Sequence, residues 1–390
     1  MAKRVSKPRV EKVIARPEVT GIAIPAPVQM SDVLGQDRAV EVLQSALRSE
    51  RVHHAWIFHG PTGVGKFTLA LSFAATLLDP TSSGGLSGFV EPEVGSRTQQ
   101  LLQAGTHPDL QIVVKELAKF HHDSQVRDRK LLNIPVEVIE KFLIEPATKS
   151  ASSSNAITAR AQRVFIVDEA ELIRTDGQNQ ILKTLEEPPA GTVIILVTSQ
   201  EERLLPTIRS RCQRIGLGLL PPDAMNAWMK KNASDVTGPE KEWLLEFSQG
   251  APGVVAAARQ AGLYAWHQTM LPLLQQMMKG KYILEFSAAA HQLLDTYSTT
   301  WVDDHENASK EAANRAGANW LFRIVSDVLR KQLRAAKAHS QIESTLVAIQ
   351  LVRDAEMQLA SNVQQAAALD SMGAEIANAF AMAELARGRA

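Results

Sequence analysis

The first half of the chain alternates between short apolar runs and stretches with helical spacing. Residues 32–50 place Val40, Leu43 and Leu47 on one helical face. Continuous apolar runs occur at 55–59, 110–114, 164–167 and 193–197. Such runs are typical of strands covered on both faces, as in a parallel sheet flanked by helices. The alternation continues to about Ile215 and predicts a layered α/β domain.

The strand pattern stops after Pro222, and short helices are predicted at 224–231, 241–247 and 252–261. Two apolar stripes with helical spacing lie further along the chain. The first comprises Trp320, Leu321, Ile324, Val325, Val328 and Leu329, and the second Ile342, Leu346, Ile349, Val352 and Leu359. Both stripes are interpreted as the core of a helical bundle.

Two stretches look irregular by composition. Residues 1–30 mix Lys, Arg, Pro and Val and are interpreted as a flexible basic arm, whose contact with DNA is left open. Residues 149–161, KSASSSNAITARA, have low complexity and predict a flexible insertion. Residues 80–95, rich in Gly, Ser and Pro, are typical of a loop.

Charge and cysteine usage exclude some classes of protein. The 390 residues carry 42 Lys+Arg and 42 Asp+Glu, so any nucleic-acid contact must come from a local basic patch. Cys212 is the single cysteine, which excludes an intrachain disulfide and suits a reducing cytoplasm. No run approaches the roughly 20 apolar residues of a membrane span. The basic start lacks the apolar run of a secretory signal.

A glycine loop with the sequence GPTGVGKFT lies between a predicted strand and a helix predicted at 66–78. This is the setting of a phosphate-binding loop, although an ordinary glycine turn is the alternative. Backbone N–H groups and the helix N-terminus would face the phosphates, and Lys66 would reach the β/γ-phosphates. The candidate nucleotide contacts are Gly60, Gly63, Val64, Gly65, Lys66, Phe67 and Thr68.

The loop lacks its usual metal ligand. Phe67 follows Lys66, where a Ser or Thr hydroxyl would hold Mg²⁺. Thr68 comes one position later and is rotated by about 100° around the helix, so its hydroxyl is expected to point elsewhere. The sequence therefore predicts a phosphate cradle without the hydroxyl, and leaves ATP with Mg²⁺ open as a cofactor.

Two acidic residues follow the apolar run that ends at Val167. In phosphate-loop enzymes, Asp168 would help to hold Mg²⁺ if Mg-ATP binds. Glu169 would orient or deprotonate the attacking water, or would be vestigial in a chain that does not hydrolyse ATP. Strands often end in solvated charges, but the position about a hundred residues after the glycine loop favours a nucleotide site.

Five stretches occur in a fixed order: GQDRAVEVLQSAL, RVHHAWIFHGPTGVGK, GTHPDL, KTLEEPP and LLPTIRSRC. Together they resemble the bacterial clamp-loader subunits of DNA polymerase III, of the delta-prime type and its tau/gamma relatives. The resemblance is strong from Asp32 to about Ile215 and weaker beyond. It implies an AAA+ P-loop domain at 31–215 after the arm, a helical lid at 216–265, and an all-α collar or oligomerisation domain at 266–390.

The same resemblance assigns roles to two further residues. Thr198 matches the sensor 1 position, and Arg211 lies in the Ser-Arg-Cys motif, whose arginine projects into the ATP site of a neighbouring subunit. A guanidinium is a planar, permanently charged fork that suits phosphate oxygens. Without the motif, a surface arginine after a strand would be the better interpretation. Cys212 would be a small packed residue rather than a nucleophile.

Three departures place the chain within this family. Phe67 replaces the metal-binding hydroxyl, and Gly253 stands where a motor subunit would carry its sensor 2 arginine. Both departures resemble the delta-prime type, which donates an arginine without needing its own hydrolysis. Residues 79–105 contain no cysteine, so the zinc module of many relatives is missing and zinc is not expected. That loop must be held by packing alone, or be mobile.

The resemblance implies a non-motor subunit that donates Arg211 to a neighbour and helps to load the sliding clamp onto primed DNA. The implied partners are the tau/gamma and delta subunits, the clamp and primed DNA, with no membrane. Polymerase activity would belong to this chain by association only. An active tau/gamma-type motor is an alternative favoured by Lys66, Asp168 and Glu169. An AAA+ ATPase outside replication is a further alternative that the LEEPP and Ser-Arg-Cys stretches oppose.

Overall fold

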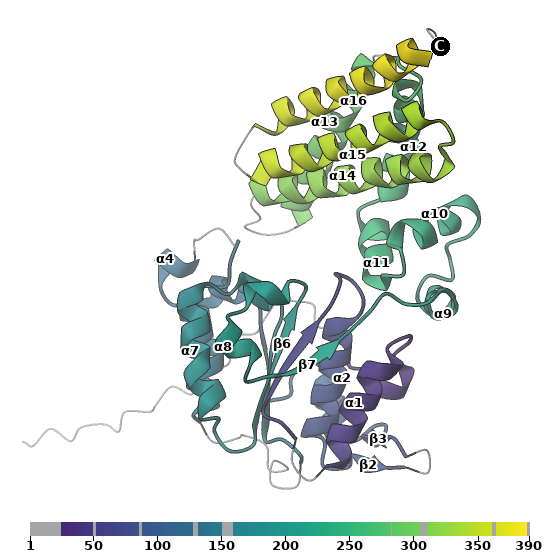
Figure 1. The fold of residues 1–390 in the computed structure, drawn as a ribbon. Coiled ribbons are helices and arrows are strands. Elements are labelled where there is room, and N and C mark those ends of the chain that lie inside the picture. Colours follow the sequence, from purple (N-terminus) through teal and green to yellow (C-terminus); the bar gives the residue numbers. More distant parts are fainter. Residues whose placement is uncertain are drawn as a thin grey trace, which may run out of the picture.

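A computed structural model describes the chain over residues 25–49, 52–85, 88–127, 132–149, 159–281, 283–304, 310–360 and 364–387. The basic arm up to residue 24 and residues 150–158 of the predicted insertion lie outside these residues. Figure 1 shows a layered sheet-and-helix part followed by helices, so the predicted fold class is confirmed.

Five parallel strands form the central sheet in the order β4-β5-β6-β1-β7. Their bounds are β1 Ala55–His59, β4 Leu110–Val113, β5 Arg163–Val167, β6 Thr192–Thr198 and β7 Gln213–Gly216. The three inner strands are buried almost throughout, which explains their continuous apolar runs. Strand β7 lies at the edge and exposes Gln213 and Arg214, so the apolar pattern did not single it out.

Short helices and turns surround this sheet. The helices are α1 Asp37–Arg48, α2 Lys66–Leu78, α3 Arg97–Gln103, α4 Ser124–Arg127, α5 Val136–Ile139, α6 Glu145–Ala147, α7 Thr175–Glu186 and α8 Pro206–Arg209. Single 3₁₀ turns occur at Met30–Asp32, Lys115–Phe120, Ala170–Leu172 and Glu201–Arg203, and a π-helical turn at Glu140–Ile144. Helix α2 has the bounds that the sequence predicted.

Alternate residues of each strand enter two separate cores, because successive side chains of a strand point to opposite faces. Trp56 and Phe58 of β1 pack on the face that α1 and α2 cover. Ala55 and Ile57 pack on the other face, with residues of α5 and α7. Burial on both faces is the physical reason for the apolar runs.

A buried carboxylate holds the segment that follows α2. Asp79 is fully buried and accepts hydrogen bonds from the backbone and hydroxyl of Thr81, from Ser96 and from Gln99. Burial raises the pKa of Asp79, but these bonds outweigh it and leave the pKa below its ordinary value. The prediction that packing alone holds this cysteine-free segment is therefore wrong. Part of the predicted loop also pairs, as the two-residue strands β2 Ser83–Gly84 and β3 Val90–Glu91.

After Gly216, the described residues form helices and no strands. These are α9 Pro222–Asn232, α10 Gly238–Ser248, α11 Pro252–Gln260, α12 Leu263–Met277, α13 Leu284–Asp304, α14 Lys310–Ala335, α15 His339–Ala360 and α16 Gln365–Arg387. In Figure 1, α9–α11 lie between the sheet and a bundle formed by the later helices. Helices α10 and α11 pack against α12 as well as against each other, so a boundary at residue 265 stays a prediction. None of the described helices is long and apolar enough to cross a bilayer.

The first predicted stripe lies in α14, and all of it except the half-buried Trp320 is buried. The second is only partly right. Helix α15 buries Thr345, Ala348, Val352 and Ala355, whereas Leu346 is 51% exposed. The prediction that Leu346 belongs to the core is wrong. Small residues let α15 pack between α14 and α16 along a face rotated away from Leu346.

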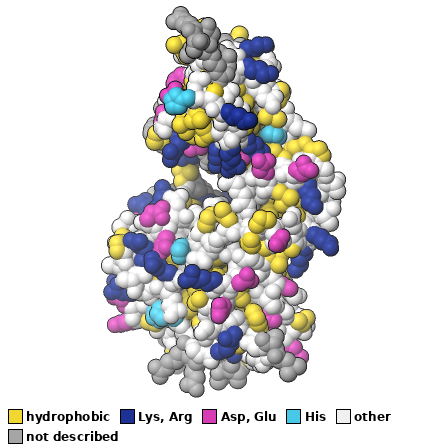
Figure 2. All heavy atoms as spheres, turned by 45° about the vertical axis from the view of Figure 1, so that its right-hand side comes forward, with side chains coloured by type: hydrophobic (Ala, Val, Ile, Leu, Met, Phe, Trp, Pro, Cys, Tyr) yellow, Lys and Arg dark blue, Asp and Glu magenta, His cyan; other side chains and the backbone are white. Residues whose placement is uncertain are grey.

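Positive and negative side chains are interspersed over the face of the molecule shown in Figure 2. This mixture agrees with equal numbers of basic and acidic residues in the sequence. The formal net charge is zero, so attraction of charged partners depends on local groups of side chains.

Candidate nucleotide site and arginine finger

The glycine loop connects the end of β1 to the start of α2, as its sequence predicts. Its three glycines, Gly60, Gly63 and Gly65, have φ angles of 141°, 82° and 96°, which L-residues with side chains rarely adopt. A Cβ atom at Gly60 would also collide with the carbonyl oxygen of Leu217, which follows the neighbouring strand β7. The loop can therefore form only because glycines stand at these places.

Lys66 turns back onto the loop that carries it. Its Nζ atom donates hydrogen bonds to the carbonyl oxygens of Gly60 at 2.9 Å and Pro61 at 2.8 Å. The side chain is buried, and burial lowers the pKa of Lys66 although Glu171 and Asp168 oppose this shift. The ammonium group thus binds two carbonyl oxygens of the loop that precedes it.

Helix α11 begins directly on the glycine loop. The N–H of Gly253 donates a hydrogen bond of 2.7 Å to the carbonyl oxygen of Gly63. A Cβ atom on Gly253 would lie 2.8 Å from the Cα of Gly63, closer than real Cβ contacts. The residue predicted at the sensor 2 position is therefore a contact point for the loop, and a side chain there would separate the two backbones.

A second tether of the loop was not predicted. Gln36 is 5% exposed, and its amide nitrogen donates hydrogen bonds to the carbonyl oxygens of Val64 and Gly218. Its amide oxygen accepts the N–H of Gly218. The glutamine lies just before α1, far from the glycine loop in the sequence, so no local pattern connects the two.

Three carboxyl groups follow β5, and two of them lie near Lys66. The pKa of Asp168 is raised to about 6, mainly by burial and also by the charges of Glu169 and Glu171, although the N–H of Glu169 and the charge of Lys66 oppose the shift. Glu171 was missed by the sequence analysis. Its only sequence signal was a third carboxylate close behind Asp168 and Glu169, because the 3₁₀ turn at Ala170–Leu172 that places it was not predicted.

Glu169 forms an ion pair with a lysine that follows the neighbouring strand. Its Oε2 atom lies 2.6 Å from Nζ of Lys115. Lys115 is the second residue after β4, the strand that pairs with β5. The backbone of Glu169 adopts a left-handed conformation with φ 49°, which non-glycine residues rarely do. The ion pair therefore directs one carboxylate oxygen of Glu169 toward Lys115 rather than toward the glycine loop.

Thr198, predicted as sensor 1, is 1% exposed at the end of β6. Its hydroxyl oxygen accepts the N–H of Gln200, and the hydroxyl bonds to Glu171. Burial raises the pKa of Glu171, but hydrogen bonds from Ser199 and Thr198 outweigh it and lower the pKa overall. Parallel register places Thr198 beside His59, so the sheet brings Thr198, the glycine loop and the acidic residues to one edge.

The residues fit a magnesium nucleotide poorly. Phe67 packs against the core beside the sheet, and Thr68 is exposed on the outside of α2. Neither supplies a hydroxyl toward Asp168 through a recorded hydrogen bond within the described part of the chain. The described structure therefore shows no side-chain hydroxyl at the position where Mg²⁺ would be held beside the glycine loop.

Arg211 lies between α8 and β7 and faces outward. Its Nη2 atom lies 2.7 Å from Oε1 of Glu186, the last residue of α7, and its Nη1 donates to the carbonyl oxygen of Thr207 at 3.0 Å. The Arg211 side chain is 39% exposed. Cys212 is half-buried, and burial raises its pKa to about 12, so the thiol stays protonated. The structure brings Arg211 to neither Lys66 nor Asp168 through any recorded bond.

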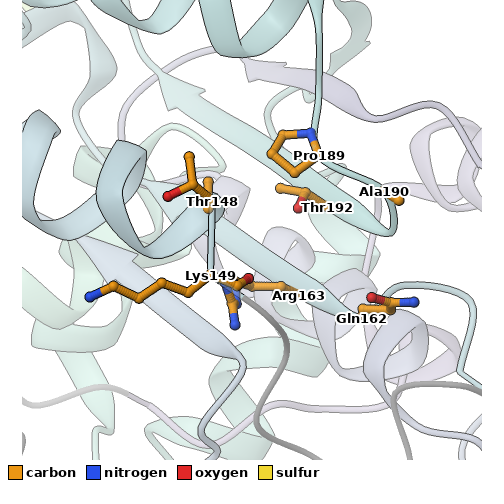
Figure 3. A pocket seen from close by; sticks show the side chains of 8 residues that line it. Thr148, Lys149, Gln162, Arg163, Pro189, Ala190 and Thr192 are labelled. Atoms are coloured by element: carbon orange, nitrogen blue, oxygen red, sulfur yellow. The ribbon is translucent and has the colours of Figure 1, made fainter.

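A cavity of about 190 Å³ lies at the opposite edge of the sheet, where β5 and β6 begin (Figure 3). Its lining residues are Ala147, Thr148, Lys149, Gln162, Arg163, Pro189, Ala190 and Thr192. The guanidinium of Arg163 is already bonded to the carbonyl oxygens of Pro146 and Lys149 and paired with Asp109. None of the predicted site residues faces this cavity.

Comparisons with known proteins point in one direction. Residues 35–220 match a family model described as "DNA polymerase III, delta subunit". The chain is similar to the DNA polymerase III subunit delta' of Pseudomonas aeruginosa, with 31% identity over 66% of this chain and 70% of that one. The corresponding protein of Escherichia coli is 29% identical over 76% of each chain.

Two further relatives belong to a neighbouring type. The DNA polymerase III subunit gamma/tau of Mycobacterium tuberculosis is 30% identical over 53% of this chain but only 31% of its own length. A crystal structure of a DNA polymerase III gamma subunit-related protein from Thermotoga maritima is 15% identical, with a TM-score of 0.43, and covers 88% of this chain and 100% of that one.

Proposed function

The chain belongs to the delta-prime subunit family of DNA polymerase III, and we propose that it serves a clamp loader as an arginine donor rather than as an ATPase motor. In this role it occupies one position in the ring, extends Arg211 to the nucleotide of a neighbour, and helps to load the sliding clamp onto primed DNA. In this proposal its own glycine loop serves as a packing contact for α11 rather than as a site of ATP hydrolysis.

One observation carries the non-motor part of this proposal. Phe67 stands where a Ser or Thr hydroxyl would hold Mg²⁺, so the chain lacks one of the ligands that position the metal on a nucleotide. The hydrogen bonds of Gly253 and Lys66 with the loop use carbonyl oxygens and not the backbone N–H groups that would face a phosphate. The loss of the metal ligand is therefore what opposes a productive Mg-ATP complex.

The donor part is supported by the exposure and chemistry of Arg211. Its side chain is 39% exposed, and the contacts with Glu186 and Thr207 leave other N–H groups of the guanidinium unused. A guanidinium keeps its charge at all physiological pH values and can hold two phosphate oxygens at once. Placed against the γ-phosphate of a neighbour, it would stabilise the charge that develops there during transfer.

The proposed partners follow from family membership. We infer gamma/tau-type motor subunits and a delta subunit as neighbours in the ring, with the helices α12–α16 as the part that joins them. The sliding clamp and primed DNA are the proposed substrates of the assembled loader. The motor alternative requires Glu169 to act on water, whereas in this structure Glu169 is paired with Lys115.

Steady-state ATP turnover by the purified chain with Mg²⁺ tests the proposal. The expected result is turnover indistinguishable from that of the Lys66→Ala variant, which removes the ammonium group and serves as the control. Loss of the metal-ligand hydroxyl removes positioning and charge stabilisation that typically supply several kcal/mol. Turnover at the level of a motor subunit, abolished by Lys66→Ala, would establish the motor alternative instead.

A further inference from the structure

The proposed arginine finger has a counter-ion within its own chain. Helix α7 ends at Glu186, and the link between α8 and β7 brings Arg211 against it, with 2.7 Å between Nη2 and Oε1. The two side chains are 39% and 50% exposed. The pair is therefore open to a ligand that approaches from outside the chain.

A carboxylate and a phosphate compete for the same edge of a guanidinium. Both present two oxygens at a spacing that matches the parallel N–H groups of the fork. Oε1 of Glu186 already occupies the Nη2 side, while the carbonyl oxygen of Thr207 fixes Nη1. A phosphate that takes both groups of this edge must displace the carboxylate, and until then the pair carries little net charge outward.

We propose that Glu186 is a positioning residue that neutralises Arg211 in the separate chain and competes with the neighbour's nucleotide phosphate for it. The inference rests on the proposed donor function and adds a regulation to it. The ion pair between Glu186 and Arg211 breaks only when a neighbouring subunit presents a nucleotide phosphate. Until then, Arg211 does not bind other anions.

The size of the effect follows from the exposure of the pair. Solvent-exposed ion pairs change an equilibrium by a factor of up to about five. Removing the charge of Glu186 should therefore lower the apparent KM for ATP of the loader by up to about fivefold. The kcat should stay unchanged or rise, because the guanidinium itself is intact.

The test uses clamp loaders reconstituted with gamma/tau and delta subunits and either the wild-type chain or Glu186→Gln. The amide keeps the shape and an acceptor oxygen but removes the charge. ATP hydrolysis, stimulated by clamp and primed DNA, is measured across ATP concentrations and at low and high salt. The KM difference should shrink as salt rises, because screening weakens a solvent-exposed pair.

Two matched variants isolate the contact. Glu187→Gln removes the same charge one residue further on, where the described structure records no side-chain ion pair, and should shift KM less. Glu186→Gln combined with Arg211→Ala should behave like Arg211→Ala alone, because a competitor has no effect once the finger is gone.

The outcomes separate this inference from the donor function. If Arg211→Ala leaves hydrolysis at the wild-type rate, the donor function fails and the inference fails with it. If Arg211→Ala slows hydrolysis but Glu186→Gln matches the wild type or Glu187→Gln, only the competition is overturned. A lower kcat with an unchanged KM for Glu186→Gln would also overturn it, since the carboxylate would then orient the finger rather than withhold it.

Discussion

Two cations of this chain come from nucleotide-site motifs, and the fold treats them in opposite ways. Lys66 is 9% exposed and donates to carbonyl oxygens of its own loop. Arg211 is 39% exposed, and its carboxylate partner is itself half in solvent. Lys66 is therefore buried against its own loop, whereas Arg211 lies at the surface of the chain.

The difference teaches that a motif specifies a donor group but not the direction in which it acts. Lys66 starts α2 after β1, and a distant helix, α11, covers the loop beside it. Arg211 precedes the edge strand β7, where no further strand of the described sheet covers it. The packing around each motif therefore decides whether its cation lies against its own chain or at the surface.

The largest expected effect comes from Arg211→Ala in a reconstituted loader. Arginine fingers can be worth about 10³–10⁵ in rate at one site, and the loss over the whole complex should be smaller because other sites keep their arginines. The measurement is clamp- and DNA-stimulated ATP hydrolysis, with assembly followed by size-exclusion chromatography. Lysine should rescue poorly, because an ammonium lacks the bidentate fork.

Arg214→Ala is the matched control, since Arg214 is a more exposed arginine of β7 with its own partner, Glu201. It should leave hydrolysis near the wild-type rate. If the Arg211→Ala loader assembles fully and loads clamps at the wild-type rate, Arg211 is only a surface residue, and the comparison between the two cations collapses.

The next effect concerns the inward-facing site, through Asp168→Asn. Folding raises the pKa of Asp168 from 3.8 to about 6, so the folded chain binds this proton more tightly than the unfolded chain. The contribution of Asp168 to the free energy of unfolding therefore falls as pH rises from about 4 to about 6 and stays low above that. Asn cannot ionise, so the variant should be more stable at pH 8 by up to about 3 kcal/mol.

Urea denaturation at pH 4 and pH 8 measures this gain, which should be much smaller at pH 4. Glu202→Gln removes an exposed carboxylate after β6 and serves as the control, with little change at either pH. An equal gain at both pH values, or a loss at pH 8, would contradict the burial of an ionised Asp168 beside Glu171.

The smallest effect tests the joint between α11 and the glycine loop. Alanine normally stabilises a helix by about 1 kcal/mol relative to glycine. A Cβ on Gly253 would lie 2.8 Å from the Cα of Gly63, so Gly253→Ala should instead destabilise the chain by about 1–2 kcal/mol. Ala256→Gly, at an exposed position of the same helix, should also destabilise it. Denaturation midpoints measure both changes in stability. If Gly253→Ala stabilises the chain while Ala256→Gly destabilises it, α11 does not pack closely on the glycine loop.

Much of the fold followed from local pattern. Continuous apolar runs predicted β1, β4, β5 and β6, and the bounds of α2 were predicted to the residue. The edge strand β7 was not predicted as a separate strand. Gln213 and Arg214 face water, so β7 has no continuous apolar run. Leu346 was wrongly predicted to be buried. Helical periodicity identifies apolar side chains, but it does not show that the neighbouring helices contact small residues of α15 instead.

The sequence by itself determined the glycine loop, the acidic strand end and the position of Arg211, because each depends on residues close together in the chain. Only the tertiary structure decided their partners. Gly253 meets Gly63, Lys115 meets Glu169, and Glu186 meets Arg211 across separations that no periodicity spans. Partner choice depends on how strands and helices are oriented after they pack, and that orientation decides whether a charge faces inward or out.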